Sequence, residues 1–325
     1  MLVYILRRLA QTVLVLAVTS ALVFAGIFMV GDPIEMLVNP QADQIEKDRA
    51  RTALGLDRPM LVQYGLFVKN ALSGDLGISF VYGRPAMDVI VERMPATLEL
   101  AALAMVISIA VGIPLGLYAG LKPDGAISKA IMAGSIVGFS LPTFWVGLLL
   151  IMLFAVQLGW LPSTGRGPTL DLLGLKVSIL TWEGLRHALL PAINLALFKL
   201  SLIIRLTRAQ VRENVLLDYM RFARAKGLSR NRVLGVHLLK NIMIPLVTVI
   251  GLELGSVIAF AIVTESIFAW PGMGKLVIDS IFQLDRPVVV AYLMITVTLF
   301  IFINLVVDIL YSVLDPRVRL DAAKV

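Results

Sequence analysis

Few residues of this chain have the types and spacing that chemistry requires. Its 325 residues contain no cysteine and only two histidines, His187 and His237. The lack of cysteine excludes disulfides, iron–sulfur clusters and thiol catalysis, and two isolated histidines are too few for a histidine-rich metal site. No paired carboxylates, His-Glu-x-x-His motif or Ser-His-Asp set accompanies them. We therefore predict that the chain has no catalytic residue of its own and binds no metal or cofactor.

The run Gly272-Met273-Gly274-Lys275 has part of the pattern of a phosphate-binding loop. It lacks the first glycine at the required spacing, and Leu276 occupies the position where serine or threonine would hold magnesium. The alternative interpretation is a turn that re-enters the membrane after the preceding apolar segment. We adopt the turn, and we predict that this chain does not hydrolyse ATP itself.

Two ionisable residues, Lys199 and Glu253, lie deep inside long apolar runs. At about 1.5 Å per helical residue, Lys199 lies roughly 17 Å from one membrane surface and Glu253 about 14 Å from the other, so their depths agree across a core of about 30 Å. Buried membrane charges are costly and usually pair or face a water-filled cavity. We predict that both face a water-filled cavity and each other, which would suit the cavity to charged or zwitterionic solutes. The alternatives are a purely structural pair, or Lys199 facing another subunit.

The elements that position these residues are apolar helices. Hydrophobic residues make up 58% of the chain and charged residues 16%, and the mean hydropathy is +0.89. A soluble domain is nearer one-quarter charged, whereas about 20 apolar residues are enough to cross a bilayer. The composition therefore predicts an all-α integral membrane protein with six spans, at residues 9–30, 97–121, 130–158, 188–204, 244–268 and 288–314. Pro114, Pro142 and Pro191 lie within spans and could allow kinks.

The placement of lysine and arginine predicts orientation, because cytoplasmic loops carry an excess of both. Sixteen basic residues flank the spans on the side of the two termini, nine of them between Arg205 and Lys240. The short loops on the opposite side have five: Arg166, Lys176, Arg186, Lys275 and Arg286. Both termini are therefore predicted to be cytoplasmic. The net charge of +7 is largely a signal of topology rather than of nucleic-acid binding.

The spans predict a single integral domain, residues 1–325, with two large segments outside the membrane. Residues 31–95 form a partly helical external segment after the first span, and residues 97–314 hold spans two to six. Within this core, residues 205–243 form a cytoplasmic segment. Glu99 lies near a span end, where helix capping or snorkelling is a sufficient explanation.

The cytoplasmic segment contains a predicted two-turn helix at residues 219–226, standing free below the membrane. Asp218 is placed to cap its first turn, Gly227 to end it, and Ser229 to cap the helix that follows. Two turns are too few for stability in isolation, so the apolar face of this helix requires a partner. That partner is either a groove in another protein, or the membrane surface or a neighbouring helix. Residues at helical spacing form this face: Tyr219, Phe222, Ala223 and Lys226.

The same segment resembles the long-loop variant of the Glu-Ala-Ala motif in permease subunits of bacterial ABC importers. Arg221-Phe222-Ala223 occupies the Glu-Ala-Ala positions, with Gly227 at the motif glycine and Pro245 at its closing proline. Only Ala223 keeps the motif identities, and the interval from glycine to proline is longer than in sugar-type permeases. Both departures, together with the form Ala-Arg-Ala-Lys-Gly, match the dipeptide/oligopeptide/nickel family.

Further blocks extend the resemblance, which is to the first of the two permeases of that family, along nearly the whole chain. They follow in the family's order: Arg7-Arg8, Gly31-Asp32-Pro33, Leu54-Gly55-Leu56-Asp57-Arg58-Pro59, Gly74-Asp75-Leu76-Gly77, Arg93-Met94-Pro95-Ala96-Thr97, Leu141-Pro142-Thr143-Phe144-Trp145, His187-Ala188-Leu189-Leu190-Pro191, Arg205-Leu206-Thr207-Arg208, Trp270-Pro271-Gly272-Met273-Gly274 and Asp315-Pro316-Arg317.

The resemblance implies the transmembrane domain of a type I ABC importer in the bacterial inner membrane. It implies as partners a homologous second permease, two ATP-binding subunits that would hold ATP and magnesium, an external solute-binding protein and membrane lipid. Its implied cargo is short peptides, with nickel chelates, glutathione or opine-like compounds as the alternative. The short helix would couple to an ATPase cleft through Asp218, Tyr219, Arg221, Phe222, Ala223, Arg224, Ala225, Lys226, Gly227 and Leu228.

Overall fold

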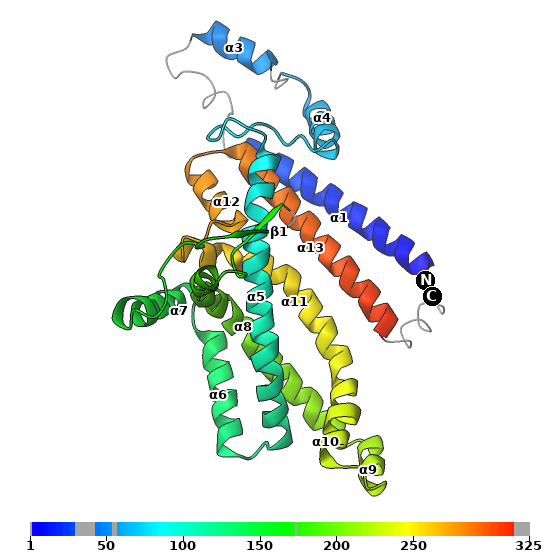
Figure 1. Cartoon of the computed structure of the whole chain (residues 1–325). Helices are drawn as coiled ribbons and strands as arrows, with labels where there is room; N and C mark the ends of the chain where they lie inside the picture. Colours follow the sequence, from blue (N-terminus) through cyan, green and yellow to red (C-terminus); the bar gives the residue numbers. More distant parts are fainter. Residues whose placement is uncertain (1, 30–42, 54–56, 173, 315–325) are drawn as a thin grey trace. The chain divides into compact units, whose positions relative to one another are not determined.

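Long helices dominate the computed structural model (Figure 1), which describes residues 2–29, 43–53, 57–172 and 174–314. The sequence blocks at residues 31–33, 54–56 and 315–317 lie outside these ranges. The elements before the middle of the chain are α1 (Leu2–Met29), α3 (Gln44–Ala53), α4 (Met60–Leu72), α5 (Ala86–Leu121), α6 (Ala126–Ser140), α7 (Thr143–Leu150) and the π-helix η1 (Ile151–Gln157). Those that follow are β1 (Leu170–Leu172), β2 (Leu175–Val177), α8 (Trp182–Val215), α9 (Asp218–Ala225), α10 (Arg230–Arg232), the π-helix η2 (Val233–Leu238), α11 (Leu239–Ile267), α12 (Met273–Phe282) and α13 (Arg286–Leu314).

Within the described residues, four helices are long and apolar enough to cross a membrane. They are α5, α8, the continuous helix Arg230–Ile267 that joins α10, η2 and α11, and α13 as far as Val307. A shorter apolar stretch, Ala10–Gly26, lies within α1. The chain is therefore a helical membrane protein, as the composition predicts.

The third predicted span, residues 130–158, is not one straight helix. Helix α6 ends at Ser140, and the second half, from Thr143 to Gln157, is bent by 107° from the first. Proline at position 142 lacks an N–H donor and disfavours helical geometry in the residue before it. Leu141 accordingly has extended dihedrals, with φ −80° and ψ 135°. Pro114 and Pro191, by contrast, lie inside continuous helices.

The prediction of an all-α fold is wrong in one detail, because β1 and β2 form an antiparallel two-stranded sheet. Residues 170–177 alternate in a way that suits a hairpin, with Asp171 opposite Lys176 and Leu172 opposite Leu175. Gly174 has a φ of +82°, and its N–H donates to the Asp171 carboxylate at 2.8 Å. The hairpin has only eight residues and lies between two predicted spans, so its alternating pattern did not stand out in the sequence from the longer apolar runs around it.

The described chain separates into two compact units, residues 1–92 with 277–298, and residues 93–276 with 299–325. In the first unit, helix α4 packs on α1. The Tyr64 hydroxyl lies 2.8 Å from the Ser20 hydroxyl, and the ring of Phe24 meets that of Tyr64 edge to face at 5.4 Å. The loop before α5 is held by Asp285, whose carboxylate accepts from the Ser79 hydroxyl at 2.5 Å and the Phe80 N–H at 3.1 Å.

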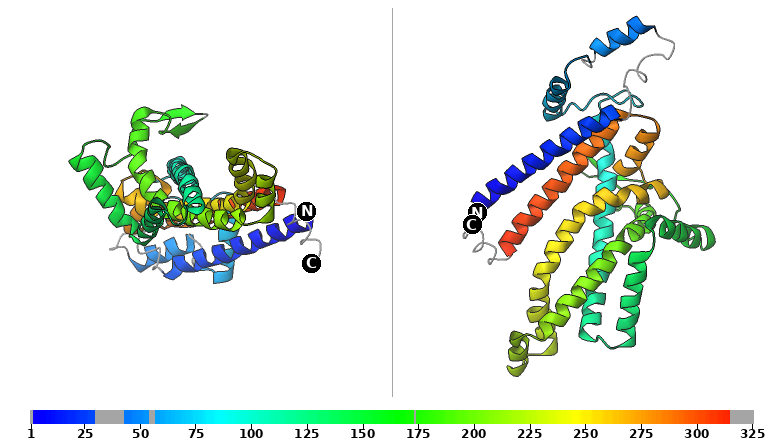
Figure 2. Two further views of the ribbon diagram at one scale, coloured as in Figure 1. Left: turned by 90° about the horizontal axis from the view of Figure 1, so that it is seen from below. Right: turned by 180° about the vertical axis from the view of Figure 1, so that it is seen from behind.

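The second unit is built around α8, which lies beside α6 and α11 (Figure 2). Three glycines of α5, spaced four residues apart, let this helix approach α8 closely. Small residues at such intervals allow helix backbones to meet where no hydrophobic effect drives association. A Cβ atom on Gly112, Gly116 or Gly120 would come within 2.6–2.8 Å of Ile203, Thr207 or Val211, respectively.

Candidate functional site

The predicted short helix is present as α9, Asp218–Ala225, and begins one residue earlier than predicted. The prediction that Asp218 caps it is wrong. Leu217, with extended dihedrals of −72° and 151°, occupies the capping position, and no side chain bonds the first turn. Asp218 is instead the first helical residue, where a negative charge suits the helix dipole, and its carboxylate lies 3.6 Å from the Arg221 guanidinium.

The end of α9 is the one the sequence predicts. Gly227 has a φ of +73°, which a residue with a side chain adopts only with strain. Its N–H donates to the Arg224 carbonyl at 3.0 Å, and the Leu228 N–H donates to the Ala223 carbonyl at 3.4 Å. This pattern satisfies the last carbonyls of the helix and turns the chain toward α10. Ser229 occupies the capping position of α10, although its side chain makes no capping bond.

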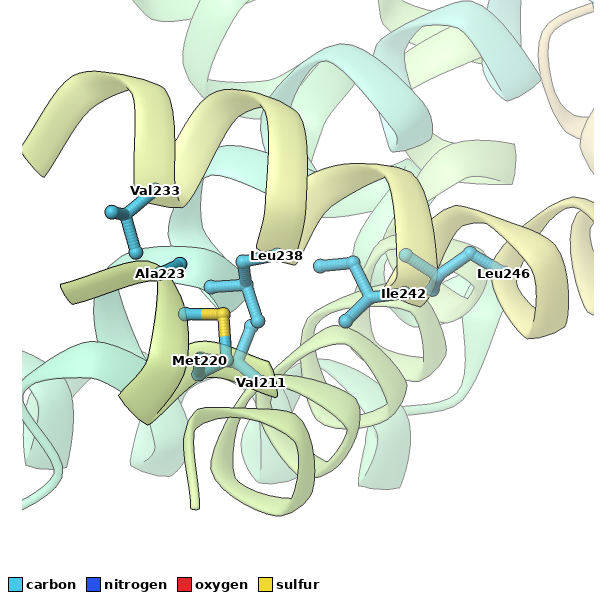
Figure 3. Packing of buried hydrophobic residues seen from close by; sticks show 7 residues of the cluster. All are labelled: Val211, Met220, Ala223, Val233, Leu238, Ile242 and Leu246. Atoms are coloured by element: carbon cyan, nitrogen blue, oxygen red, sulfur yellow. The ribbon is translucent and has the colours of Figure 1, made fainter. Parts of the chain in front are cut away.

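Helix α9 does not stand free, and that part of the prediction is wrong. Met220 and Ala223 are buried in a hydrophobic cluster built from α8, α9, η2 and α11. Tyr219 packs on the same cluster, and its hydroxyl donates to the Asn214 side-chain oxygen at 3.0 Å. A helix too short to be stable alone is thus held by tertiary contacts. Figure 3 shows the seven buried members, Val211, Met220, Ala223, Val233, Leu238, Ile242 and Leu246.

The outward face of α9 carries one large apolar side chain in a basic frame. Phe222 is 61% exposed, and Arg221, Arg224, Ala225 and Lys226 are exposed around it. The Lys226 ammonium lies 4.6 Å from the centre of the Phe222 ring. Of the two predicted aromatics, Tyr219 therefore belongs to the internal contact and Phe222 to the free surface.

The structure brings Lys199 and Glu253 together as an ion pair between α8 and α11. The Lys199 ammonium also donates to the Ser256 hydroxyl at 2.7 Å, and that hydroxyl donates to the Glu253 carboxylate at 2.9 Å. The Lys199 side chain is 7% exposed and that of Glu253 is 23% exposed. The ammonium also lies 5.3 Å from the centre of the Phe198 ring, which stacks on Phe139. The pair is thus enclosed on the lysine side and open on the glutamate side.

A second buried carboxylate, Glu265, was not singled out from the sequence. It lies near the end of α11 and accepts from the Thr97 hydroxyl of α5 at 2.6 Å and from the Lys275 N–H at 2.9 Å. The Thr97 oxygen in turn accepts from the Met273 N–H at 2.8 Å. Carboxylate and hydroxyl therefore fix the first turn of α12, where N–H groups lack helical partners. The adjacent Gly272 is required for this approach, since a Cβ there would lie 2.3 Å from the carboxylate.

The contacts of Glu265 and Thr97 with the first turn of α12 explain the run Gly272–Lys275, which has part of a phosphate-loop pattern. Gly272 and Gly274 both lie close to the Glu265 carboxylate, which accepts from the Lys275 N–H at 2.9 Å, whereas the Gly272 N–H donates to the Trp270 carbonyl at 2.8 Å. The indole N–H of Trp270 donates to the Ala96 carbonyl at 2.9 Å and joins the same region to α5. The turn interpretation of the sequence agrees with this geometry. Within the described residues, no group of three metal-ligating side chains is placed to hold an ion.

Glu99 is the third carboxylate that holds parts of the chain together through hydrogen bonds. The prediction that helix capping or snorkelling is a sufficient explanation for its position is wrong. It accepts from the Arg166 guanidinium at 2.5 and 3.1 Å, from both the N–H and hydroxyl of Ser178, and from the Ile179 N–H. It thereby holds the loop that carries the hairpin onto α5. An acid and an arginine 67 residues apart give no spacing signal in a single sequence, so the pair is found only in the fold.

Together, the apolar helices, the buried polar contacts and the short basic helix define a helical membrane protein with an exposed basic helix. Residues 112–320 match the family described as "Binding-protein-dependent transport system inner membrane component". Residues 1–101 match the family described as the N-terminal part of the same kind of membrane component. This chain belongs to that family of inner membrane components.

Two curated relatives have nearly the same length as this chain. The dipeptide transport system permease protein DppB of Escherichia coli strain K12 is 39% identical over 336 residues, covering 98% of this chain and 99% of the relative. The protein of the same name from Alkalihalophilus pseudofirmus is 37% identical over 332 residues, covering 98% and 100%. A solved structure, the inward-facing MetNI methionine ABC transporter, superposes with a TM-score of 0.55 at 16% identity. It covers 70% of this chain and 97% of that one, and it shows the shared fold.

Proposed function

We propose that this chain forms half of the translocation pathway of an ATP-driven importer of short peptides. The observation that carries the proposal is the surface of α9, where Phe222 projects from a basic frame on a helix anchored by its opposite face. Such a surface suits insertion into a groove of another protein. ATP-binding subunits, a homologous second permease and an external solute-binding protein complete the proposed assembly. ATP hydrolysis would then belong to the partners and not to this chain.

Peptide is the proposed cargo because relatives that match this chain over their whole length are named dipeptide permeases. The second candidate is the same architecture carrying a nickel chelate, glutathione or an opine-like compound. The two separate in proteoliposomes that contain the chain with its partner subunits and binding protein. We expect ATP-dependent uptake of labelled dipeptides, in excess over nickel chelates and glutathione. Uptake by the chain alone, without ATP-binding subunits, would refute the proposal.

The proposed topology has six spans with both termini in the cytoplasm. Beyond the long helices, this requires α1 to cross the membrane and the bent pair of α6 and α7–η1 to count as one span. A reporter fused after Val325 is expected to be active only in the cytoplasm, and one inserted near Asn70 only outside. The opposite pattern at either site would overturn the orientation and, with it, the coupling role of α9.

The pair of Lys199 and Glu253 is proposed to line the translocation path. Two opposite charges at mid-membrane depth resemble the pair of charges that a zwitterionic peptide carries, and the glutamate side is the more open. A passing peptide could exchange partners with the pair without leaving a buried charge unpaired. The alternative role, a structural clamp between α8 and α11, uses the same contact.

A charge swap distinguishes the path from the clamp. Lys199→Glu alone leaves two acids together and is expected to destabilise the chain by about 3–5 kcal/mol, as for other broken buried pairs. Adding Glu253→Lys restores the pair with reversed polarity and should recover stability. If the pair lines the path, the double variant changes the relative uptake of acidic and basic peptides. Recovered stability with an unchanged peptide ranking would assign the pair to the clamp.

A further inference from the structure

An apolar cavity of about 530 Å³ lies in the first unit, between the end of α1, the end of α12 and the beginning of α13. This volume is within the range of about 300–1,000 Å³ that small-molecule sites occupy. Most of its walls are aliphatic, from residues such as Val23, Val290 and Leu293. Gly26 lines the cavity as well, and a Cβ atom at that position would meet no atom within 4 Å. The cavity therefore has space beside Gly26 for a larger side chain.

Two polar residues line the cavity among the aliphatic ones. Arg286 and Ser280 line it, and both residues are buried, with Arg286 only 7% exposed. A guanidinium group carries five N–H donors in a fixed fork that fits phosphate oxygens in pairs, so it can hold a phosphate in addition to a neighbouring group. Arg286 is one of the five basic residues on the side that the charge asymmetry leaves poor in cations. A buried cation in the wall of this cavity offers an anionic ligand a group of opposite charge.

The turn between α12 and α13 fixes the backbone around Ser280 and Arg286. Leu284 has a φ of +56°, which costs a leucine free energy and persists only where surrounding contacts fix it. Those contacts come from Asp285, which is fully buried, accepts from Ser79 and Phe80, and donates its N–H to the Ser280 carbonyl at 2.8 Å. The strained turn places Leu284 and Arg286 in the cavity wall together.

We infer that this cavity binds an anionic phospholipid, with an acyl chain in the aliphatic part and the phosphate at Arg286 and Ser280. A lining that combines one charged residue and one hydroxyl residue with aliphatic side chains matches the two chemical parts of such a lipid. Leu22 and Ile281, which line the cavity, are exposed large apolar side chains, as a lipid-facing entrance requires. Neutral lipids lack the complementary charge, and a soluble anion would leave the aliphatic part unfilled.

Lipid retention by the intact complex tests the inference. The complex, purified with its partner subunits in mild detergent, is exchanged with phosphatidylglycerol, phosphatidylcholine or diacylglycerol, and bound lipid is counted by native mass spectrometry. We expect at least about fivefold more phosphatidylglycerol than phosphatidylcholine, as a charge-assisted phosphate contact allows, and little diacylglycerol. Equal retention of phosphatidylglycerol and diacylglycerol would overturn the inference, because it would mean that no phosphate is recognised.

Two variants localise the site. Gly26→Leu fills the cavity and should lower phosphatidylglycerol retention at least about fivefold, whereas Gly134→Leu, at another glycine with open space in an apolar helix, should not. Arg286→Gln should remove the preference for the anionic lipid. If Arg286→Gln does not fold, Gly26→Leu and the wild-type lipid series still decide. Unchanged retention in Gly26→Leu would refute the site.

A cysteine-free chain also allows a direct check of what occupies the cavity entrance. A fluorophore on Ile281→Cys should be quenched by brominated phosphatidylglycerol in the assembled complex. Protection from quenching, together with crosslinking to the second permease, would assign the entrance to a subunit interface and overturn the lipid site.

Discussion

Replacing Phe222 with alanine should weaken the attachment of an ATP-binding subunit without weakening the fold. The side chain is 61% exposed, so a partner groove can still bury about three-fifths of it. An aromatic side chain buries roughly 200 Å², which leaves about 120 Å² for the partner. At about 25 cal/mol per Å², this area corresponds to about 3 kcal/mol, or roughly a hundredfold in affinity, as an upper bound.

The matched variant is Met220→Ala, on the opposite face of the same helix. Met220 is fully buried in the cluster, and truncation of a buried methionine costs about 2–5 kcal/mol. We expect Met220→Ala to lower the free energy of unfolding clearly, as measured by thermal unfolding of the detergent-solubilised chain. For Phe222→Ala the free energy of unfolding should change by no more than about 0.5 kcal/mol, as for other exposed positions.

Affinity is measured by titrating labelled ATP-binding subunit onto the permease pair, and coupling by the stimulation of ATP hydrolysis by loaded binding protein. Phe282→Ala, at an exposed phenylalanine of α12, serves as the control for loss of an exposed aromatic ring. Both quantities should fall for Phe222→Ala and stay unchanged for Phe282→Ala. If Phe222→Ala binds and couples normally, α9 has only the internal packing role seen in the cluster.

Three further outcomes follow from the buried joints and the close helix contact. Glu265→Leu removes the acceptor for the Thr97 hydroxyl and the Lys275 N–H, so we expect the free energy of unfolding to fall by about 2–6 kcal/mol in thermal unfolding. Glu265→Gln should lower it less, because glutamine keeps one acceptor oxygen. Gly116→Ala puts a Cβ 2.7 Å from the Ile204 carbonyl and should cost about 1–3 kcal/mol; equal stability of Gly116→Ala and the open-space control Gly134→Ala would contradict the close contact of α5 with α8. Glu99→Gln leaves the Arg166 guanidinium, whose side chain is 12% exposed, without its ion pair, and we expect limited proteolysis within residues 166–179 to become faster. Unchanged cleavage would show that the loop is held by other contacts.

The sequence predicts those features that depend on neighbours along the chain. Apolar runs set where helices cross the membrane, because the bilayer rewards about 20 consecutive apolar residues wherever they occur. Gly227 ends α9 because only a few residues separate it from the carbonyls it satisfies. The bend at Pro142 also has a local cause, although its size of 107° does not follow from the proline alone. The glycine spacing of α5 was a local signal too, visible as Gly112, Gly116 and Gly120, although it did not enter the span predictions.

Only the tertiary structure decides which polar side chains meet. Glu99 with Arg166, and Glu265 with Thr97, join residues 67 and 168 positions apart. The contact of Lys199 with Glu253 is the exception, because their matching depths in two spans predicted it from the sequence. Tyr219 and Phe222 look alike in the sequence pattern, yet one packs inward and the other faces outward. The physical reason is that the hydrophobic effect and helix propensity act on each segment by its own composition. The partner of a buried charge or ring is fixed by how helices distant in sequence come together in space.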